Sequence, residues 1–223
     1  MIDKESSGCH QKVVRLLAAV FLLIGISAYG QEQDQEDDLA KAIGSGEFIF
    51  NGKLRFWNAN DNAAKSSQAY TFGTNFGYLT KAYKGFQVYI EGESVVAITP
   101  DLYFDGLNGL TDRTNVTDPE TLELNQMYIA YNDSFNDTEL EVKVGRQAAI
   151  VEDERFIGRV SARQDDQTFD ALYGRLQNDQ KGLAFEYAYM YQVNRLLAEE
   201  VDWRRDAHVF ILRYFNIKKI RFG

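Results

Sequence analysis

Apolar and polar residues alternate along most of the chain beyond Gly46. Between residues 46 and 58, every second position on one side is aromatic, aliphatic or glycine, as at Phe48, Phe50, Leu54 and Phe56. A β-strand turns successive side chains to opposite faces, so this period of two predicts a strand between an apolar and a wet surface. The clearest case is the run from Leu183 to Val193, where six apolar or aromatic residues alternate with smaller or polar ones.

The gaps between the alternating segments differ in length in a regular way. They cover residues 59–68, 81–85, 97–121, 132–137, 148–167, 178–182 and 194–206, long and short in turn. Transmembrane barrels show this asymmetry, with tight periplasmic turns at one rim and long loops at the other. The pattern predicts an all-β, antiparallel, up-and-down transmembrane β-barrel with about eight strands. A soluble β-sandwich is the alternative, but it would tend to hide its aromatic residues and lack the asymmetry.

Composition supports the same fold. The chain has 15 Phe, 13 Tyr and 17 Gly but only 2 Pro in 223 residues. Proline removes a hydrogen-bond donor from a strand, so its scarcity suits a chain that is mostly strand. The net charge is −9, and we expect no nucleic-acid partner.

The N-terminus is predicted to be a targeting segment. Lys12 and Arg15 precede an apolar run that ends in small residues, which is typical of a secretory signal peptide cleaved before Gln31. The expected domains are a signal peptide over 1–30, an acidic periplasmic linker over 31–45 and a barrel domain over 46–223. Cys9, the only cysteine, lies in the signal segment, so no disulfide is expected.

The stretch from Gly145 to Asp170 is the most highly charged part of the chain. Arginines at positions 146, 155, 159 and 163 are interspersed with aspartates and glutamates. Arginine gives permanently charged, bidentate contacts to carboxylates and phosphates, which suits a narrow passage for anions. Sequence spacing leaves open whether this loop folds into a pore or remains in open water.

The sequence gives little support for a catalytic site or a metal site. His208 has no serine or aspartate tied to it by sequence, so we expect no enzyme. The acidic residues of loop 97–121, including Asp105, Asp112 and Asp118, do not match the spacing of an EF-hand. We interpret this loop as a solvated surface and expect no metal and no cofactor.

The charged stretch resembles a signature of the alginate-export family of outer-membrane porins. The matching residues are Gly145-Arg146-Gln147, then Asp153-Glu154-Arg155-Phe156-Ile157-Gly158, then Arg163-Gln164 and Gln167-Thr168-Phe169-Asp170-Ala171. The resemblance implies a barrel in the bacterial outer membrane whose pore is lined by basic residues. By this resemblance, the expected pore and constriction residues are Arg146, Gln147, Asp153, Arg155, Arg163 and Asp170. Arg159 is an addition of this chain. Lys53 and Arg55 are also expected to line the pore, because they lie on the polar face of the strand predicted between residues 46 and 58.

The implied function is a channel that passes anionic polysaccharide, oligosaccharide or small solutes through a charged constriction. A small eight-stranded structural or adhesive barrel without a conducting pore is the alternative. Outer-membrane lipid is the expected partner, and the sequence does not identify any periplasmic secretion partner.

Two features depart from the family pattern. The chain ends at the start of a ninth strand, so it is expected to be the N-terminal portion of a larger barrel. Arg146 shares its strand face with Leu140, Val142 and Val144, which are expected to face lipid. A lumenal Arg146 therefore requires a β-bulge, for which Gly145 is the natural place.

Overall fold

The computed structural model describes residues 35–61, 64–148, 157–160, 163–194 and 203–215. The chain divides into two compact units, 1–41 and 42–223. The predicted signal peptide lies outside the described residues. Within the predicted linker, residues Gln35–Gly44 form helix α2, which the sequence analysis did not anticipate. None of the helices in the described ranges is long and apolar enough to cross a membrane.

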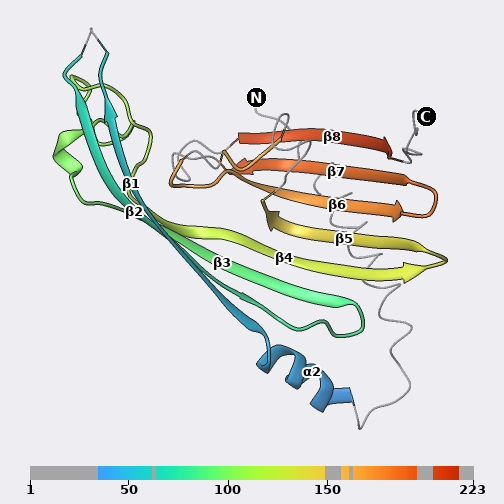
Figure 1. Cartoon of the computed structure of the whole chain (residues 1–223). Helices are drawn as coiled ribbons and strands as arrows, with labels where there is room; N and C mark the ends of the chain where they lie inside the picture. Colours follow the sequence, from blue (N-terminus) through green and yellow to red (C-terminus); the bar gives the residue numbers. More distant parts are fainter. Residues whose placement is uncertain (1–34, 62–63, 149–156, 161–162, 195–202, 216–223) are drawn as a thin grey trace, which may run out of the picture. The chain divides into compact units, whose positions relative to one another are not determined.

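The second unit is built on one antiparallel sheet. Its strands lie in the order of the chain, and each pairs with the next (Figure 1). They are β1 (Glu47–Ala59), β2 (Ser67–Leu79), β3 (Phe86–Ala97), β4 (Thr121–Phe135), β5 (Thr138–Gln147), β6 (Thr168–Asn178), β7 (Leu183–Asn194) and β8 (Trp203–Tyr214). A short 3₁₀ helix, η2 (Pro100–Leu102), lies in the β3–β4 loop. The prediction of an all-β, antiparallel, up-and-down fold is confirmed.

The boundaries differ from prediction mainly around β4 and β8. The gap predicted over 132–137 is only two residues long, because β4 continues to Phe135 and β5 begins at Thr138. Asn136 and Asp137 form this turn with φ of 45° and 61°. Left-handed backbone at both central positions matches the twist of a tight hairpin, and asparagine and aspartate tolerate it better than most residues. Strand β8 likewise begins at Trp203, earlier than predicted.

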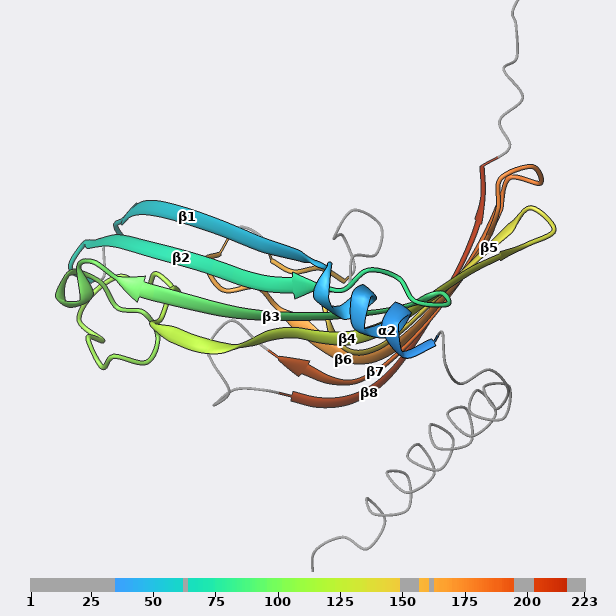
Figure 2. The same cartoon turned by 90° about the horizontal axis from the view of Figure 1, so that it is seen from below.

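Burial on the two faces of the sheet is the reverse of that in a soluble protein. On β2 and β3 the apolar side chains of Phe72, Ile90 and Val96 are exposed, while Thr71 and Glu93 are fully buried. In a soluble antiparallel sheet the apolar face would pack on a core. The sheet, strongly twisted in Figure 2, thus has an apolar outward face and a polar, partly covered face, hereafter the inner face. This arrangement is the one that a lipid-facing sheet requires.

Bulges explain why some strands alternate poorly in the sequence. Strand β4 has an irregularity opposite Glu91 and Gly92, where Asn125 has no partner in the register. Leu122 and Leu124 lie outward before it, and the outward row then continues at Met127, with the opposite parity. A single extra residue shifts the phase of a strand, so period-two reasoning fails across it.

The expected bulge at Gly145 is wrong. Pairing continues without a shift through Gly145 and Arg146, on the β4 side and on the β6 side. Gly145 instead has a φ of +130°, and Arg146 stays in the row of Val142 and Val144. Its charge is neutralised there by an ion pair, described below, which removes the need for it to change faces.

Candidate pore-lining site

The loop between β5 and β6 (residues 148–167, the β5–β6 loop) is described at 148, 157–160 and 163–167, and residues 163–166 lie against the inner face of the sheet. In its described part, residues 163–166 make hydrogen bonds to strands β1, β2 and β3. These strands are 73 to 111 positions away in the sequence. The loop is therefore docked on polar sheet surface at the end where the long connections lie.

Gln164 is the anchor of the docked loop. Its side chain is almost completely buried, and Nε2 donates to the carbonyl of Lys53 at 3.2 Å, the carbonyl of Thr71 at 3.0 Å and Oγ1 of Thr71 at 2.9 Å. Glycine at position 73 creates the space for it, since a Cβ there would lie 2.9 Å from Gln164 Oε1. A glycine inside a strand often marks such a close approach.

Asp118 joins the β5–β6 loop to two other parts of the chain. Its Oδ1 accepts the backbone N–H of Gln164 at 3.1 Å, and its carboxylate accepts Nη1 of Arg55 at 3.0 and 3.1 Å. The Asp118 carboxylate is fully buried, and the guanidinium of Arg55 is largely so. The β3–β4 loop, strand β1 and the β5–β6 loop thus meet at one carboxylate.

The β3–β4 loop is itself a folded support for Asp118. Tyr103 is fully buried against Ala69 and Val116, and its hydroxyl donates to the Asp118 carbonyl at 2.9 Å. Asp105 accepts two backbone N–H groups of the same loop at 2.7 Å each. The interpretation of this loop as a solvated acidic surface is therefore wrong for Asp105 and Asp118, because both carboxylates are used inside it. Among the described residues, no group of acidic, histidine or cysteine side chains is arranged to hold a metal.

Replacing Asp118 by alanine is expected to release the β5–β6 loop locally. The change leaves the Gln164 N–H without its acceptor and costs about 1–3 kcal/mol of docking free energy. Hydrogen exchange should show the Gln164 amide losing protection by roughly one to two orders of magnitude. Asp101→Ala, an exposed position on the same loop, is the matched control, and equal protection in the two variants would contradict the role of Asp118.

Two cations beside the docked loop have no carboxylate partner in the described part of the chain. Lys53 Nζ donates to the Arg163 carbonyl at 2.5 Å, and the Arg163 guanidinium lies 6.0 Å from the centre of the Trp57 ring. Arg55 approaches the same indole at 5.7 Å, but its charge is compensated by Asp118. Lys53, Trp57 and Arg163 therefore form a partly exposed basic cluster, which we call the Lys53–Arg163 cluster.

The other expected site residues lie apart from this cluster. Arg146 Nε donates to Asp170 Oδ1 at 2.9 Å across β5 and β6, and Asn194 donates to the same oxygen. Gln147 is buried and donates to the Ala171 carbonyl at 3.1 Å. Arg159 lies 3.9 Å from Asp166 within the β5–β6 loop. Asp153 and Arg155 lie outside the described residues.

Three of the residues that build the site were not among the expected constriction residues, although Gln164 belongs to the family signature and Asp118 to the acidic loop. Gln164, Asp118 and Trp57 hold or border the basic cluster. Gly73 inside strand β2 was a usable signal, because a glycine within a strand often marks the close approach of another part of the chain. The partner of Gly73 could not be read from the sequence, since Gln164 lies 91 positions further along the chain.

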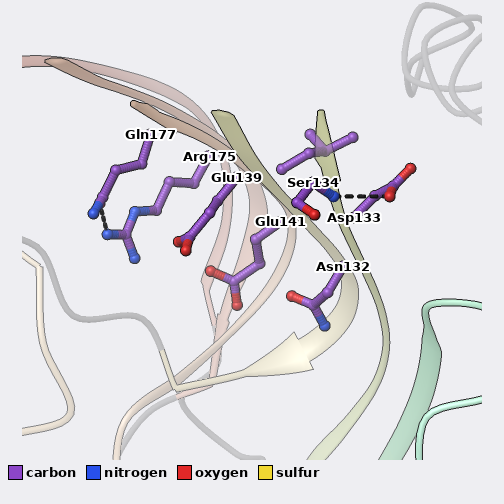
Figure 3. A pocket seen from close by; sticks show the side chains of 8 residues that line it. Asn132, Asp133, Ser134, Glu139, Glu141, Arg175 and Gln177 are labelled. Atoms are coloured by element: carbon purple, nitrogen blue, oxygen red, sulfur yellow. Dashed lines mark hydrogen bonds between the residues drawn. The ribbon is translucent and has the colours of Figure 1, made fainter. Parts of the chain in front are cut away.

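Charged side chains of both signs lie at the opposite end of the strands. A pocket of about 530 Å³ lies there beside the β4–β5 turn, lined by residues that include Asn132, Glu139, Glu141 and Arg175 (Figure 3). Arg175 donates to Gln177, and Lys143 lies 2.7 Å from Glu141 between the rings of Tyr128 and Tyr173. This end therefore combines acids with bases, with Glu139 and Glu141 beside Arg175, whereas the Lys53–Arg163 cluster has no carboxylate partner among the described residues.

His208 lies on the outward face of β8. Its Nδ1 is 2.9 Å from the Tyr187 hydroxyl, and its ring stacks with Tyr189 at 4.8 Å between centroids. These contacts resemble an aromatic cluster rather than a nucleophile with its base.

Comparison with known proteins gives one match. Residues 82–222 match the family model described as alginate export. No curated protein and no solved structure matches the chain. The matched region includes β3 to β8 and the whole β5–β6 loop.

Proposed function

The chain belongs to the alginate-export family of outer-membrane export porins, and from this premise we propose that it passes anionic polysaccharide, oligosaccharide or small anionic solutes through a charged constriction. The constriction consists of the docked β5–β6 loop together with the inner-face residues of β1 beneath it. Outer-membrane lipid covers the apolar outward face. Bacterial outer-membrane localisation follows from the family, and cleavage before Gln31 is proposed for its export.

The Lys53–Arg163 cluster is the observation that carries this proposal. The other arginines described near the passage are compensated, Arg55 by Asp118 and Arg159 by Asp166. An uncompensated pair of cations attracts a permeant anion, and the field is stronger beside low-dielectric protein than in bulk water. Trp57 adds a partly exposed aromatic surface next to these charges.

Neutralising the cluster is expected to reduce anion selectivity. The double variant Lys53→Gln and Arg163→Gln, made in the full-length protein in a planar bilayer, should shift the reversal potential in a salt gradient towards cation preference. The shift should shrink from 0.1 M to 1 M salt, because the Debye length falls from about 10 Å to about 3 Å. Both side chains are partly exposed, so the folded sheet should be retained.

The matched control removes two positive charges elsewhere. Lys65 is an exposed residue of the β1–β2 connection, and Lys81 is an exposed residue of the β2–β3 turn. Lys65→Gln with Lys81→Gln should leave the reversal potential close to that of the parent protein. An equal shift in the two double variants would show that only net charge matters. Absence of any conductance in the parent protein would favour the structural or adhesive alternative.

A further inference from the structure

Buried carboxyl groups lie where the β5–β6 loop meets strands β3 and β4. Asp165 of the loop is 1% exposed, and Glu93 of β3 is 0% exposed. Asp165 is surrounded by Glu123 of β4, Glu93 and the neighbouring Asp166. Arg159 of the same loop lies 3.9 Å from Asp166. A docked loop thus brings several acids together at a dry interface, where ionised carboxylates repel one another.

The unsatisfied polar atoms of Asp165, Gln164, Glu93 and Asn125 are all hydrogen-bond acceptors. Within the described residues, no donor reaches Glu93 Oε1, either carboxyl oxygen of Asp165, Gln164 Oε1 or Asn125 Oδ1. Glu91, the next inner-face acid on β3, is by contrast satisfied by Tyr89, Asn125 and Gln126. An unpartnered buried acceptor is costly. What the interface lacks is donors, and a carboxyl group that takes up a proton becomes one.

Asp165 and Glu123 add to the same requirement. Glu123 is a carboxyl neighbour of Asp165, and two carboxyl groups can share a hydrogen bond only if one of them carries a proton. Burial raises the pKa of Asp165 to about 9, with further contributions from Glu123, Glu93 and Asp166. The group outside the interface would have an ordinary pKa of 3.8.

We propose that residues 163–167, the described end of the β5–β6 loop, form a proton-sensitive part of the constriction, docked when protons are shared among Asp165, Glu93 and Glu123 and released when these groups ionise. The loop thereby regulates the passage that the Lys53–Arg163 cluster borders. The consequence for transport rests on the function proposed above, whereas docking itself does not.

The direction of the pH dependence follows from linkage. The docked loop binds a proton that the released loop gives up, so docking is strongest below the ordinary pKa of 3.8. Docking weakens as the pH rises from there towards about 9. For one linked proton, the equilibrium constant for docking falls by up to about tenfold per pH unit.

Distance measurement between two spin labels tests this directly. Labels on Val160→Cys in the loop and Asn60→Cys at the end of β1, both exposed positions, report whether the loop is docked. In the full-length protein in lipid nanodiscs, electron–electron resonance should give a narrow distance distribution at pH 5 and a broader one displaced to other distances at pH 9. Asp165→Asn, a neutral isostere, should keep the distribution of pH 5 at both values.

Two further variants and one additive complete the test. Glu93→Gln should also reduce the effect of pH on the distance distribution, and it provides a second test if Asp165→Asn does not fold. Asp179→Asn in the β6–β7 turn is the control and should leave the effect of pH unchanged. The proposal is overturned by distributions that are the same at pH 5 and pH 9 in the parent, or by a pH effect that persists fully in both Asp165→Asn and Glu93→Gln. A distance distribution that changes on addition of Ca²⁺ at constant pH, but does not change with pH, would also overturn the proposal. It would indicate that the carboxyl oxygens of Asp165 and Glu93 bind a metal ion instead of a proton. These distances need no permeant solute, so their outcome is independent of the reversal-potential test.

Discussion

Replacing Leu54 by arginine should destabilise the folded protein in lipid by about 2–4 kcal/mol, the cost of a basic side chain at the bilayer midplane. Leu54 lies near the middle of β1 on the outward face, and it is 71% exposed. It therefore loses little protein packing on substitution, and the cost comes from placing a charge in hydrocarbon. Urea titration of the full-length protein in lipid vesicles measures the change in the free energy of unfolding.

Asn51 provides the matched control on the same strand. It occupies the other face of β1, opposite Asn75 of β2, and is also exposed. Asn51→Arg should change the free energy of unfolding by no more than about 0.5 kcal/mol, as for most surface substitutions. Similar losses in the two variants would mean that the outward face does not meet lipid.

Gly145→Ala should cost about 2–5 kcal/mol, from backbone strain and overpacking together. Gly145 has a φ of +130°, a value that residues with a side chain rarely adopt. A Cβ there would lie 2.3 Å from the Met127 carbonyl oxygen and 2.9 Å from the Tyr128 Cα. Both are backbone atoms of a paired strand, so relief requires the β4–β5 ladder to shift.

Gly174→Ala separates this effect from the general cost of replacing glycine in a strand. Gly174 lies in the neighbouring strand β6, and a Cβ there would meet no atom within 4 Å. Chemical denaturation of the two variants should therefore differ by more than about 2 kcal/mol. If Gly145→Ala were as stable as Gly174→Ala, the left-handed conformation at Gly145 would not be required by the fold.

The docking of the β5–β6 loop links stability to the proposed transport function. Asp118 neutralises Arg55 and also accepts the Gln164 N–H, so one carboxylate sets both the charge and the position of the constriction. Lys53 and Arg163 remain uncompensated beside it within the described residues. The distribution of paired and unpaired cations, rather than the number of arginines, therefore sets the charge that this passage presents.

The strands could be predicted because each one is a local pattern. Residues such as Phe48, Phe50 and Leu54 reveal a strand through their spacing alone, since side chains two positions apart share a face. The gaps between the strands were also recognised from local composition, and the turn at Asn136-Asp137 is shorter than predicted because both residues accept left-handed backbone. Local patterning failed at Asn125, where a bulge reverses the phase of β4.

By itself, the sequence determined the all-β class, the antiparallel order and the charged β5–β6 stretch, because neighbouring residues encode all three. The tertiary structure alone decided which charges remain free. Gln164 reaches Thr71 across 93 positions and Asp118 reaches Arg55 across 63, and no periodicity extends over such separations. Arg146 and Arg163 look equivalent as charged residues of one stretch, yet the first is compensated by Asp170 and the second stands beside Lys53. Pairing depends on which strands and loops are brought together in space, and that is settled only when the whole sheet has formed.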